Sequence, residues 1–131
     1  MFSPATNVLI VDQMMTMRKI VTKICKEIGF QSIQEAADGK LAWEKISSTT
    51  PGFGLIISDW NMPNCSGVEL LKRVRSDSRF KGLPFLLVTA DAEKDQVIEA
   101  LRAGVDGYIV KPFKADTLKL KLEEVYKKKN S

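Results

Sequence analysis

The chain of 131 residues is 44% hydrophobic and 27% charged, a composition that predicts one soluble globular domain over residues 1–131. It contains no histidine, which excludes serine–histidine and cysteine–histidine nucleophilic schemes and the usual histidine-bearing zinc sites. No apolar stretch approaches the length that crosses a bilayer, and the first residues lack the pattern of a signal peptide, so we expect a cytoplasmic protein without a membrane partner.

Strand and helix patterns alternate along the chain. The predicted strands are short runs rich in apolar residues, and the predicted helices have apolar residues three and four apart. The second strand is expected to be half-exposed, and the third is apolar enough to be buried on both faces. In chain order we expect a strand at 8–11, a helix at 17–28, a strand at 30–36, a helix at 41–46, a strand at 55–59, a helix at 68–74, a strand at 85–89, a helix at 97–101, a strand at 108–110 and a helix at 118–126.

Polar residues and glycines mark the ends of several predicted helices. Thr16 is a predicted N-cap of the first helix and Gly29 its predicted stop, while Asp38-Gly39 precedes the second helix and Gly104 follows the fourth. Five such strand–helix units predict an α/β fold, a doubly wound five-stranded parallel sheet with helices on both faces and right-handed crossovers. In folds of this kind ligands bind beyond the carboxyl ends of the strands.

The net charge of +4 comes mostly from the last predicted helix. Between Lys114 and Ser131, six lysines stand against three acidic residues. A solvated helix face accounts for this excess better than a basic groove does, so we expect no nucleic-acid partner.

The two cysteines share no CxxC spacing and do not predict a disulfide framework. Cys25 falls at an apolar helical position and is predicted to be a buried thiol. Cys65 follows the third strand in a predicted loop, where a redox role is a minor alternative.

Polar side chains follow four of the predicted strands. The first strand ends at Asp12 and Gln13, the third at Asp59, the fourth at Thr89, and the fifth at Lys111. Taken alone, each fits a helix cap or a surface ion pair, but together they place two carboxylates, an amide, a hydroxyl and an ammonium at one edge of the sheet. Two nearby carboxylates repel each other unless a cation intervenes, and oxygen ligands without histidine or cysteine suit Mg²⁺.

The chain contains neither a GxxxxGK[ST] phosphate loop nor a GxGxxG dinucleotide turn, so a whole nucleotide is not the expected ligand. A single phosphoryl group fits better. Mg²⁺, Lys111 and the Thr89 hydroxyl would together hold its three oxygens. Asp59 is then the predicted nucleophile, which would form an aspartyl phosphate.

Several segments between Val8 and Tyr126 together resemble one known family. This combination is highly specific and is similar to the receiver domain of two-component response regulators, above all to single-domain members that act in chemotaxis. The resemblance implies the flavodoxin-like strand order 2-1-3-4-5. The segments are Val11-Asp12, residues 17–21, Ala37-Asp38-Gly39, residues 57–63, Val88-Thr89-Ala90 and residues 107–113.

The resemblance further implies a role for the residues at the strand ends. Asp59 would accept a phosphoryl group from a histidine kinase, and Mg²⁺ would be held by Asp12, Asp59 and the backbone carbonyl of Asn61. Thr89 would close on the phosphoryl group, and Lys111 would pair with it. The protein would assist its own phosphorylation and dephosphorylation rather than act as an enzyme on other substrates.

The same resemblance implies a switch that is read away from the phosphorylation site. Tyr108 would swing inward when Thr89 moves, which would change the surface of the fourth helix, fifth strand and fifth helix. A flagellar motor switch protein or another effector would bind this surface, a phosphatase is a further implied partner, and we expect a monomer. No output domain is expected after Tyr126, and the bond before Pro112 is expected to be cis.

Gln13 departs from the family pattern, in which an acidic residue stands directly after Asp12. Glutamine offers only a neutral carbonyl oxygen, so its place among the Mg²⁺ ligands is left open. At an effective dielectric near 20, the lost negative charge is expected to weaken Mg²⁺ binding by about 1 kcal/mol or more. We therefore expect slower phosphorylation of Asp59 than in a Gln13→Asp variant.

Several positions have alternatives that the sequence does not separate. Trp60 is either a partner-contacting aromatic or a partly covered surface ring, and Tyr108 is either a switch residue or an ordinary core or edge residue. Asn61 and Asp91 either tune hydrolysis of the phosphoryl group or are solvated loop residues. Apolar residues of the fourth helix fit the partner face and the core equally well. The residues considered for the partner face are Val97, Ile98 and Lys121.

Two other functions fit the residues as well. A Mg²⁺-dependent phosphatase of similar topology would also use an aspartate nucleophile, but it usually has a second aspartate two residues later, where this chain has Asn61. A degenerate receiver would bind partners without phosphorylation. Gln13, in place of an acidic residue, is compatible with a degenerate receiver. The retention of Asp59, Thr89 and Lys111 disfavours this alternative.

Overall fold

The computed structural model describes residues 1–50, 52–62, 65–90 and 94–130, without the side chain of Lys94. Asp91 and the last residue of the segment 57–63 lie outside these ranges. Strands and helices alternate in the predicted order, and each predicted element is present. They are β1 (Asn7–Val11), α1 (Met15–Ile28), β2 (Ser32–Ala36), α2 (Gly39–Ser48), β3 (Leu55–Asp59), α3 (Gly67–Ser76), β4 (Phe85–Thr89), α4 (Lys94–Arg102), β5 (Gly107–Val110) and α5 (Ala115–Lys129).

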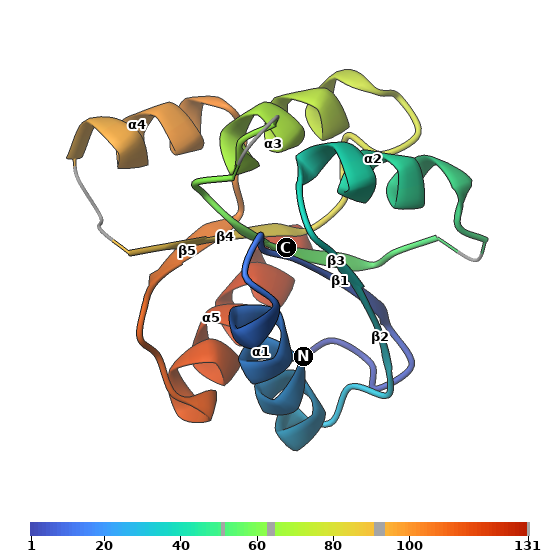
Figure 1. Ribbon diagram of the computed structural model, residues 1–131, viewed down its shortest axis with the longest axis vertical. Coiled ribbons are helices and arrows are strands. Elements are labelled where there is room, and N and C mark those ends of the chain that lie inside the picture. Colours follow the sequence, from blue (N-terminus) through green and yellow to red (C-terminus); the bar gives the residue numbers. More distant parts are fainter. Residues whose placement is uncertain (51, 63–64, 91–93, 131) are drawn as a thin grey trace.

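The strands form a parallel sheet in the order β2-β1-β3-β4-β5, which confirms the predicted fold class and topology. Figure 1 shows the two helical layers: α1 and α5 cover one face of the sheet, and α2, α3 and α4 cover the other. Because every strand points the same way, all of their carboxyl ends lie at one edge of the sheet.

The core lies on both faces of the three central strands. β3 and β4 are buried at every residue, and β1 is buried from Val8 onward, as their continuous apolar runs predict. β2, at the edge, is half-buried until its last residue, Ala36. Rigid central strands therefore carry the residues that follow them to fixed positions at the sheet edge.

Helix boundaries agree with the sequence at three places and differ at one. Gly29 follows α1 with a φ of 127°, a conformation that favours glycine, and the Asp38 side chain caps α2 by accepting a hydrogen bond from the Leu41 N–H. Gly104 follows α4, as predicted. The prediction that Thr16 caps α1 is wrong, because α1 begins two residues earlier than predicted and its N-cap is Met14, which has no capping side-chain hydrogen bond.

The Asp12 carboxylate explains the early start of α1. Its Oδ1 accepts a hydrogen bond from the Met14 N–H at 2.9 Å, which turns the chain just before the helix. The start of α3 is held by a capping box between Ser66 and Glu69. Within the described residues, no helix is both long enough and apolar enough to span a membrane.

Candidate functional site

Three of the residues predicted at the strand ends meet in direct contact. The Lys111 ammonium lies 3.2 Å from Asp59 Oδ1 and 3.6 Å from Asp12 Oδ2, so one cation bridges the two carboxylates. Asp12, Asp59 and Thr89 are all buried. The predicted proximity of Asp12, Asp59 and Lys111 is therefore confirmed.

The backbone fixes where these side chains lie. Asp59 is the last residue of β3 and pairs with Val88 of β4, so Thr89 follows one step beyond it. The Lys111 N–H donates to the Thr89 carbonyl at 2.8 Å, which sets Lys111 beside the end of β4. The Lys111–Pro112 peptide bond is cis, as the resemblance implied.

Burial and charge act against each other at Asp59. Burial raises the pKa of the Asp59 carboxyl, the nearby Asp12 carboxylate raises it further, and Lys111 and the Trp60 N–H lower it, with a net rise above the ordinary value. Two carboxylates facing one ammonium give the cluster a formal charge of −1 when all three groups are ionised. The site is therefore suited to attract a further cation.

The donor set fits Mg²⁺ better than it fits a softer metal. The oxygens available are the Asp12 and Asp59 carboxylates, the Asn61 carbonyl and the Gln13 amide, without a nitrogen or sulfur donor among them. Within the described residues, no cluster of three or more histidine, cysteine or acidic side chains is present. Mg²⁺ accepts such a sparse set because it keeps several of its waters.

Gln13 is exposed, and its side chain extends toward the loop after β3. Its Nε2 lies 3.5 Å from the Asn61 carbonyl oxygen, which makes a long hydrogen bond between the loops after β1 and β3. This is the carbonyl that the resemblance assigns to the metal. The resemblance implies a carboxylate at this position, whereas the Gln13 amide carries no charge.

Both alternatives for Trp60 are wrong. Its side chain is only 7% exposed and belongs to the core between the sheet and the helices α2 and α3. Its backbone N–H donates to Asp59 Oδ1 at 2.9 Å. Trp60 thus anchors the end of β3 from inside the protein and lies against the predicted nucleophile.

Gly67 is a site residue that sequence reasoning missed. A Cβ at this position would lie 2.3 Å from the Asp59 carbonyl oxygen and 2.8 Å from Leu87 Cδ2. Its N–H donates to the Trp60 carbonyl at 2.8 Å. Only a glycine lets the start of α3 approach the end of β3 this closely, and a single glycine after a polar loop gives no such signal in the sequence.

The face proposed for partners lies on β5 and α5 and beside α4. Tyr108 is half-buried, and Lys121 Nζ lies 5.7 Å from the centroid of its ring. Ile98 is 37% exposed, so the core alternative is wrong for Ile98, whereas Val97 is half-buried. A groove of about 430 Å³ runs beside Tyr108 between β5 and α5.

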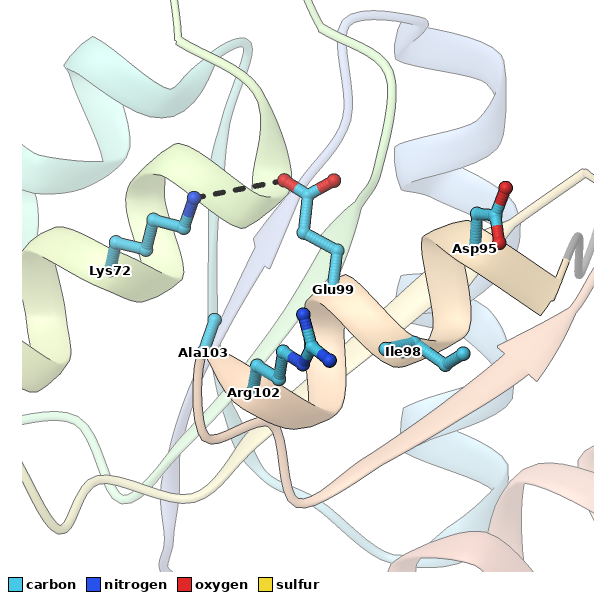
Figure 2. Close-up of a pocket in the computed structure, with 6 residues that line it drawn as sticks. All are labelled: Lys72, Asp95, Ile98, Glu99, Arg102 and Ala103. Atoms are coloured by element: carbon cyan, nitrogen blue, oxygen red, sulfur yellow. Dashed lines mark ion pairs between the residues drawn. The ribbon is translucent and has the colours of Figure 1, made fainter.

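A larger groove of about 700 Å³ lies between α3 and α4. Figure 2 shows Glu99 of α4 reaching toward Lys72 of α3, and their charged atoms are 3.7 Å apart. Asp95 and Arg102 add one further charge of each sign to the lining. None of the strand-end residues lines this groove, so it is distinct from the predicted site.

The two thiols differ in their surroundings. Cys25 is buried in the core, as predicted, and burial raises the pKa of its thiol to about 12. Burial and the nearby Glu69 also raise the pKa of the half-buried Cys65 thiol. A higher pKa lowers the fraction of reactive thiolate, which disfavours a redox role for Cys65.

Comparison with known proteins gives consistent matches over nearly the whole chain. The family model of the response regulator receiver domain matches residues 8–123. The chain is 46% identical over 124 residues to the chemotaxis protein CheY of Pseudomonas aeruginosa, covering 95% of this chain and 98% of that protein. It is 46% identical over 122 residues to the chemotaxis protein CheY-3 of Vibrio cholerae, covering 93% and 92% of the two chains. The solved structure of Vibrio cholerae CheY4 superposes with a TM-score of 0.84 at 35% identity, covering 92% of this chain and 98% of that one.

Proposed function

The chain belongs to the response regulator receiver domain family, and from that premise we propose that it is a phosphorylation-activated switch of a chemotaxis pathway. Residues 1–131 would act as a single receiver domain, with a histidine kinase upstream and a flagellar motor switch protein or another effector downstream. The contact of Lys111 with both Asp12 and Asp59 carries this proposal, because it gathers a nucleophile, a counter-cation and a second carboxylate in one place.

Asp59 is the proposed phosphoacceptor. The two described donors to its carboxylate, Lys111 and the Trp60 N–H, both reach Oδ1, so Oδ2 is the oxygen that we expect to attack phosphorus. As the new O–P bond forms, the P–N bond of the kinase phosphohistidine breaks, and its electron pair stays on the imidazole nitrogen. The product is an aspartyl phosphate with the phosphoryl group beside Lys111.

Asp12, Asp59 and the Asn61 carbonyl are the proposed holders of Mg²⁺, with Gln13 at the edge of the set. When bound, the ion would supply positive charge at the phosphoryl oxygens. Lys111 lies 3.2 Å from Asp59 Oδ1, so its ammonium would neutralise part of the negative charge of the phosphoryl group. The Thr89 hydroxyl, at the end of the neighbouring strand, would contact a third oxygen.

The change in charge at Asp59 is proposed to be read on the face formed by α4, β5 and α5. Lys111 directly follows β5 and is bonded through its backbone to Thr89, so a shift of either residue is transmitted to β5. Tyr108 lies on β5 with a half-buried ring, a position that allows it to move between the core and the surface. Exposed apolar residues on this face, among them Ile98 and Val110, give an effector a surface to bind.

Mass spectrometry after incubation with acetyl phosphate tests the proposal. We expect one added phosphoryl group per chain, dependent on Mg²⁺ and absent from the Asp59→Asn variant. Labelling that persists in Asp59→Asn, or that never occurs, would contradict the assignment of Asp59.

The same experiment separates the two other functions. A phosphatase would turn over a phosphomonoester many times without holding a stable adduct, and Asn61 in place of a second acid already disfavours that chemistry. A degenerate receiver would show no adduct and no response to beryllofluoride. A single Mg²⁺-dependent adduct fits only the proposed switch.

A further inference from the structure

Arg18 lies on the first turn of α1 and contacts the preceding loop at Asp12. Its Nη1 donates to the Asp12 carbonyl oxygen at 2.8 Å, and its Nε lies 3.2 Å from Glu35 Oε1. The Arg18 side chain is only 16% exposed. Both contacts therefore form in a partly dry environment, where hydrogen bonds to a charged group are strong.

We infer that Arg18 is a positioning residue that sets the Mg²⁺ affinity of this protein by fixing the peptide of Asp12. The inference rests on the proposed function, because it concerns the same metal site. Groups that hold a metal ligand from behind commonly change metal affinity 10- to 100-fold when they are removed. Arg18 is such a group for Asp12, since it contacts the backbone carbonyl of that residue and not its carboxylate, which is the proposed Mg²⁺ ligand.

Arginine is suited to this task because its planar fork donates in two fixed directions at once. One direction meets the Asp12 carbonyl at the end of β1, and the other meets Glu35 on the neighbouring strand β2. Glu35 is itself held by Lys19, whose Nζ lies 2.9 Å from Oε2. Burial raises the pKa of the Glu35 carboxyl, but Lys19 and Arg18 together lower it further, so its net pKa is below the ordinary value.

The loop needs this support because α1 has no side-chain cap of its own. The N-cap Met14 makes no capping hydrogen bond, so the chain before α1 is held through Asp12. The Asp12 N–H donates to the Ala36 carbonyl, and Asp12 Oδ1 accepts from the Met14 N–H. The Arg18 contact completes this set by fixing the remaining backbone group of Asp12, its carbonyl.

Charge and positioning predict opposite effects when Arg18 is removed. Losing a cation near the site makes the site more negative, and this alone would tighten Mg²⁺ binding, most clearly at low salt. Losing the hold on the Asp12 peptide would weaken Mg²⁺ binding at any salt concentration. The sign of the change therefore distinguishes a positioning role from a through-space charge effect.

The experiment compares Mg²⁺ titrations of the full chain and of three variants. The fluorescence of Trp60 is the signal that reports binding. Arg18→Met removes both the fork and the charge, Arg18→Lys keeps the charge but removes the fork, and Lys19→Met removes a cation that contacts Glu35 but not Asp12. We expect about tenfold weaker binding for Arg18→Met. Arg18→Lys should also bind more weakly, and Lys19→Met should bind as the parent does or slightly more tightly. Far-ultraviolet circular dichroism checks that each variant is folded.

Parent-like or tighter binding by folded Arg18→Met would overturn the inference and leave the proposed function intact. Should Arg18→Met fail to fold, Arg18→Lys decides in its place, because parent-like affinity in that variant would show that the fork is not needed. Absence of any Mg²⁺ response in the parent chain would overturn the proposed function and the inference together.

Discussion

Replacing Gln13 with aspartate restores a carboxylate where the family has one, and it tests how charge at this position sets metal affinity. The site now has two carboxylates and one ammonium, a formal charge of −1 with all groups ionised. Gln13→Asp would bring this to −2. The substitution also removes the long contact between Gln13 Nε2 and the Asn61 carbonyl, which frees that oxygen for the ion.

Because Gln13 is exposed, the gain in Mg²⁺ affinity is calculated with the dielectric constant of water. Two unit charges 4 Å apart in water interact by about 1 kcal/mol, so a dication gains about 2 kcal/mol from an added carboxylate at that distance. A difference of about 1.4 kcal/mol is tenfold in affinity. Because the glutamine carbonyl already offers part of this attraction as a dipole, we expect about tenfold tighter Mg²⁺ binding by Gln13→Asp.

Trp60 fluorescence is a suitable assay because its side chain is buried and its backbone N–H donates to the Asp59 carboxylate. The second tryptophan, Trp43, lies on α2 under the Arg73 guanidinium of α3 and is replaced by phenylalanine to remove background. Gln13→Asn is the matched control, since it has the length of aspartate without the charge. Equal Mg²⁺ affinities for Gln13→Asp and Gln13→Asn would refute the electrostatic reasoning.

Three further predictions concern stability and the geometry of the site. Arg75→Met removes the 2.9 Å partner of the buried Asp106 carboxylate but leaves Lys129 at 3.0 Å, so it should lower the free energy of unfolding by about 1.5–3 kcal/mol, measured by urea denaturation. Gly67→Ala should cost about 1–3 kcal/mol by overpacking and slow acetyl phosphate labelling, whereas Gly82→Ala, with open space around it, should do neither. Because the folded protein lowers the pKa of Glu35 below 4.5, Glu35 stabilises the fold above that pH and loses this contribution as pH falls through the folded pKa. Glu35→Gln should therefore flatten the loss of unfolding free energy between about pH 5 and pH 3.

The sheet and the site could be predicted from the sequence for the same reason. In a parallel sheet covered on both faces, the strands carry no charge along their length, so the first charged residue marks the end of a strand. Asp12, Asp59 and Lys111 are such residues, and parallel strands bring their ends to one edge. The strand order was not contained in these patterns, because pairing between strands far apart in sequence leaves no local signal, and it came from the family resemblance.

Two predictions made from residue type failed because contacts of other residues decided the outcome. Thr16 is a good capping residue by type, but the turn made by the Asp12 carboxylate starts α1 earlier. Trp60 stands between two polar residues in the sequence, yet α3 packs over it and buries it, because Gly67 allows the helix to come close. At Trp60 the outcome depends on a glycine at the start of the next helix, whereas at α1 a neighbouring carboxylate outweighs the capping preference of Thr16.

Arginines posed a similar difficulty, since a sequence does not show which charged residues are buried. Arg75 and Arg18 look alike in composition, on helices that carry several other basic residues. Arg75 reaches the carbonyls of Leu83 and Gly104 as well as Asp106, and thereby joins the end of α3 to the loops that flank β4 and β5. Its long apolar stem lets the guanidinium enter the protein, a placement that only three-dimensional packing decides.

Opposite ends of the sheet thus carry two different kinds of ion pair. At the amino-terminal edge, Asp106 pairs with both Arg75 and Lys129 and accepts a hydrogen bond from the Phe85 N–H. Arg75 also donates to two backbone carbonyls, so the buried carboxylate is fully compensated and this network serves stability. At the carboxyl-terminal edge, Lys111 serves two carboxylates at 3.2 and 3.6 Å, so one negative charge is left without a partner of its own in the described cluster. An uncompensated buried charge is costly for a fold. The uncompensated negative charge beside Asp59 is best explained by a cation and a phosphoryl group that bind there in turn. We therefore expect the carboxyl-terminal edge of the sheet to change on phosphorylation and the amino-terminal edge to stay rigid.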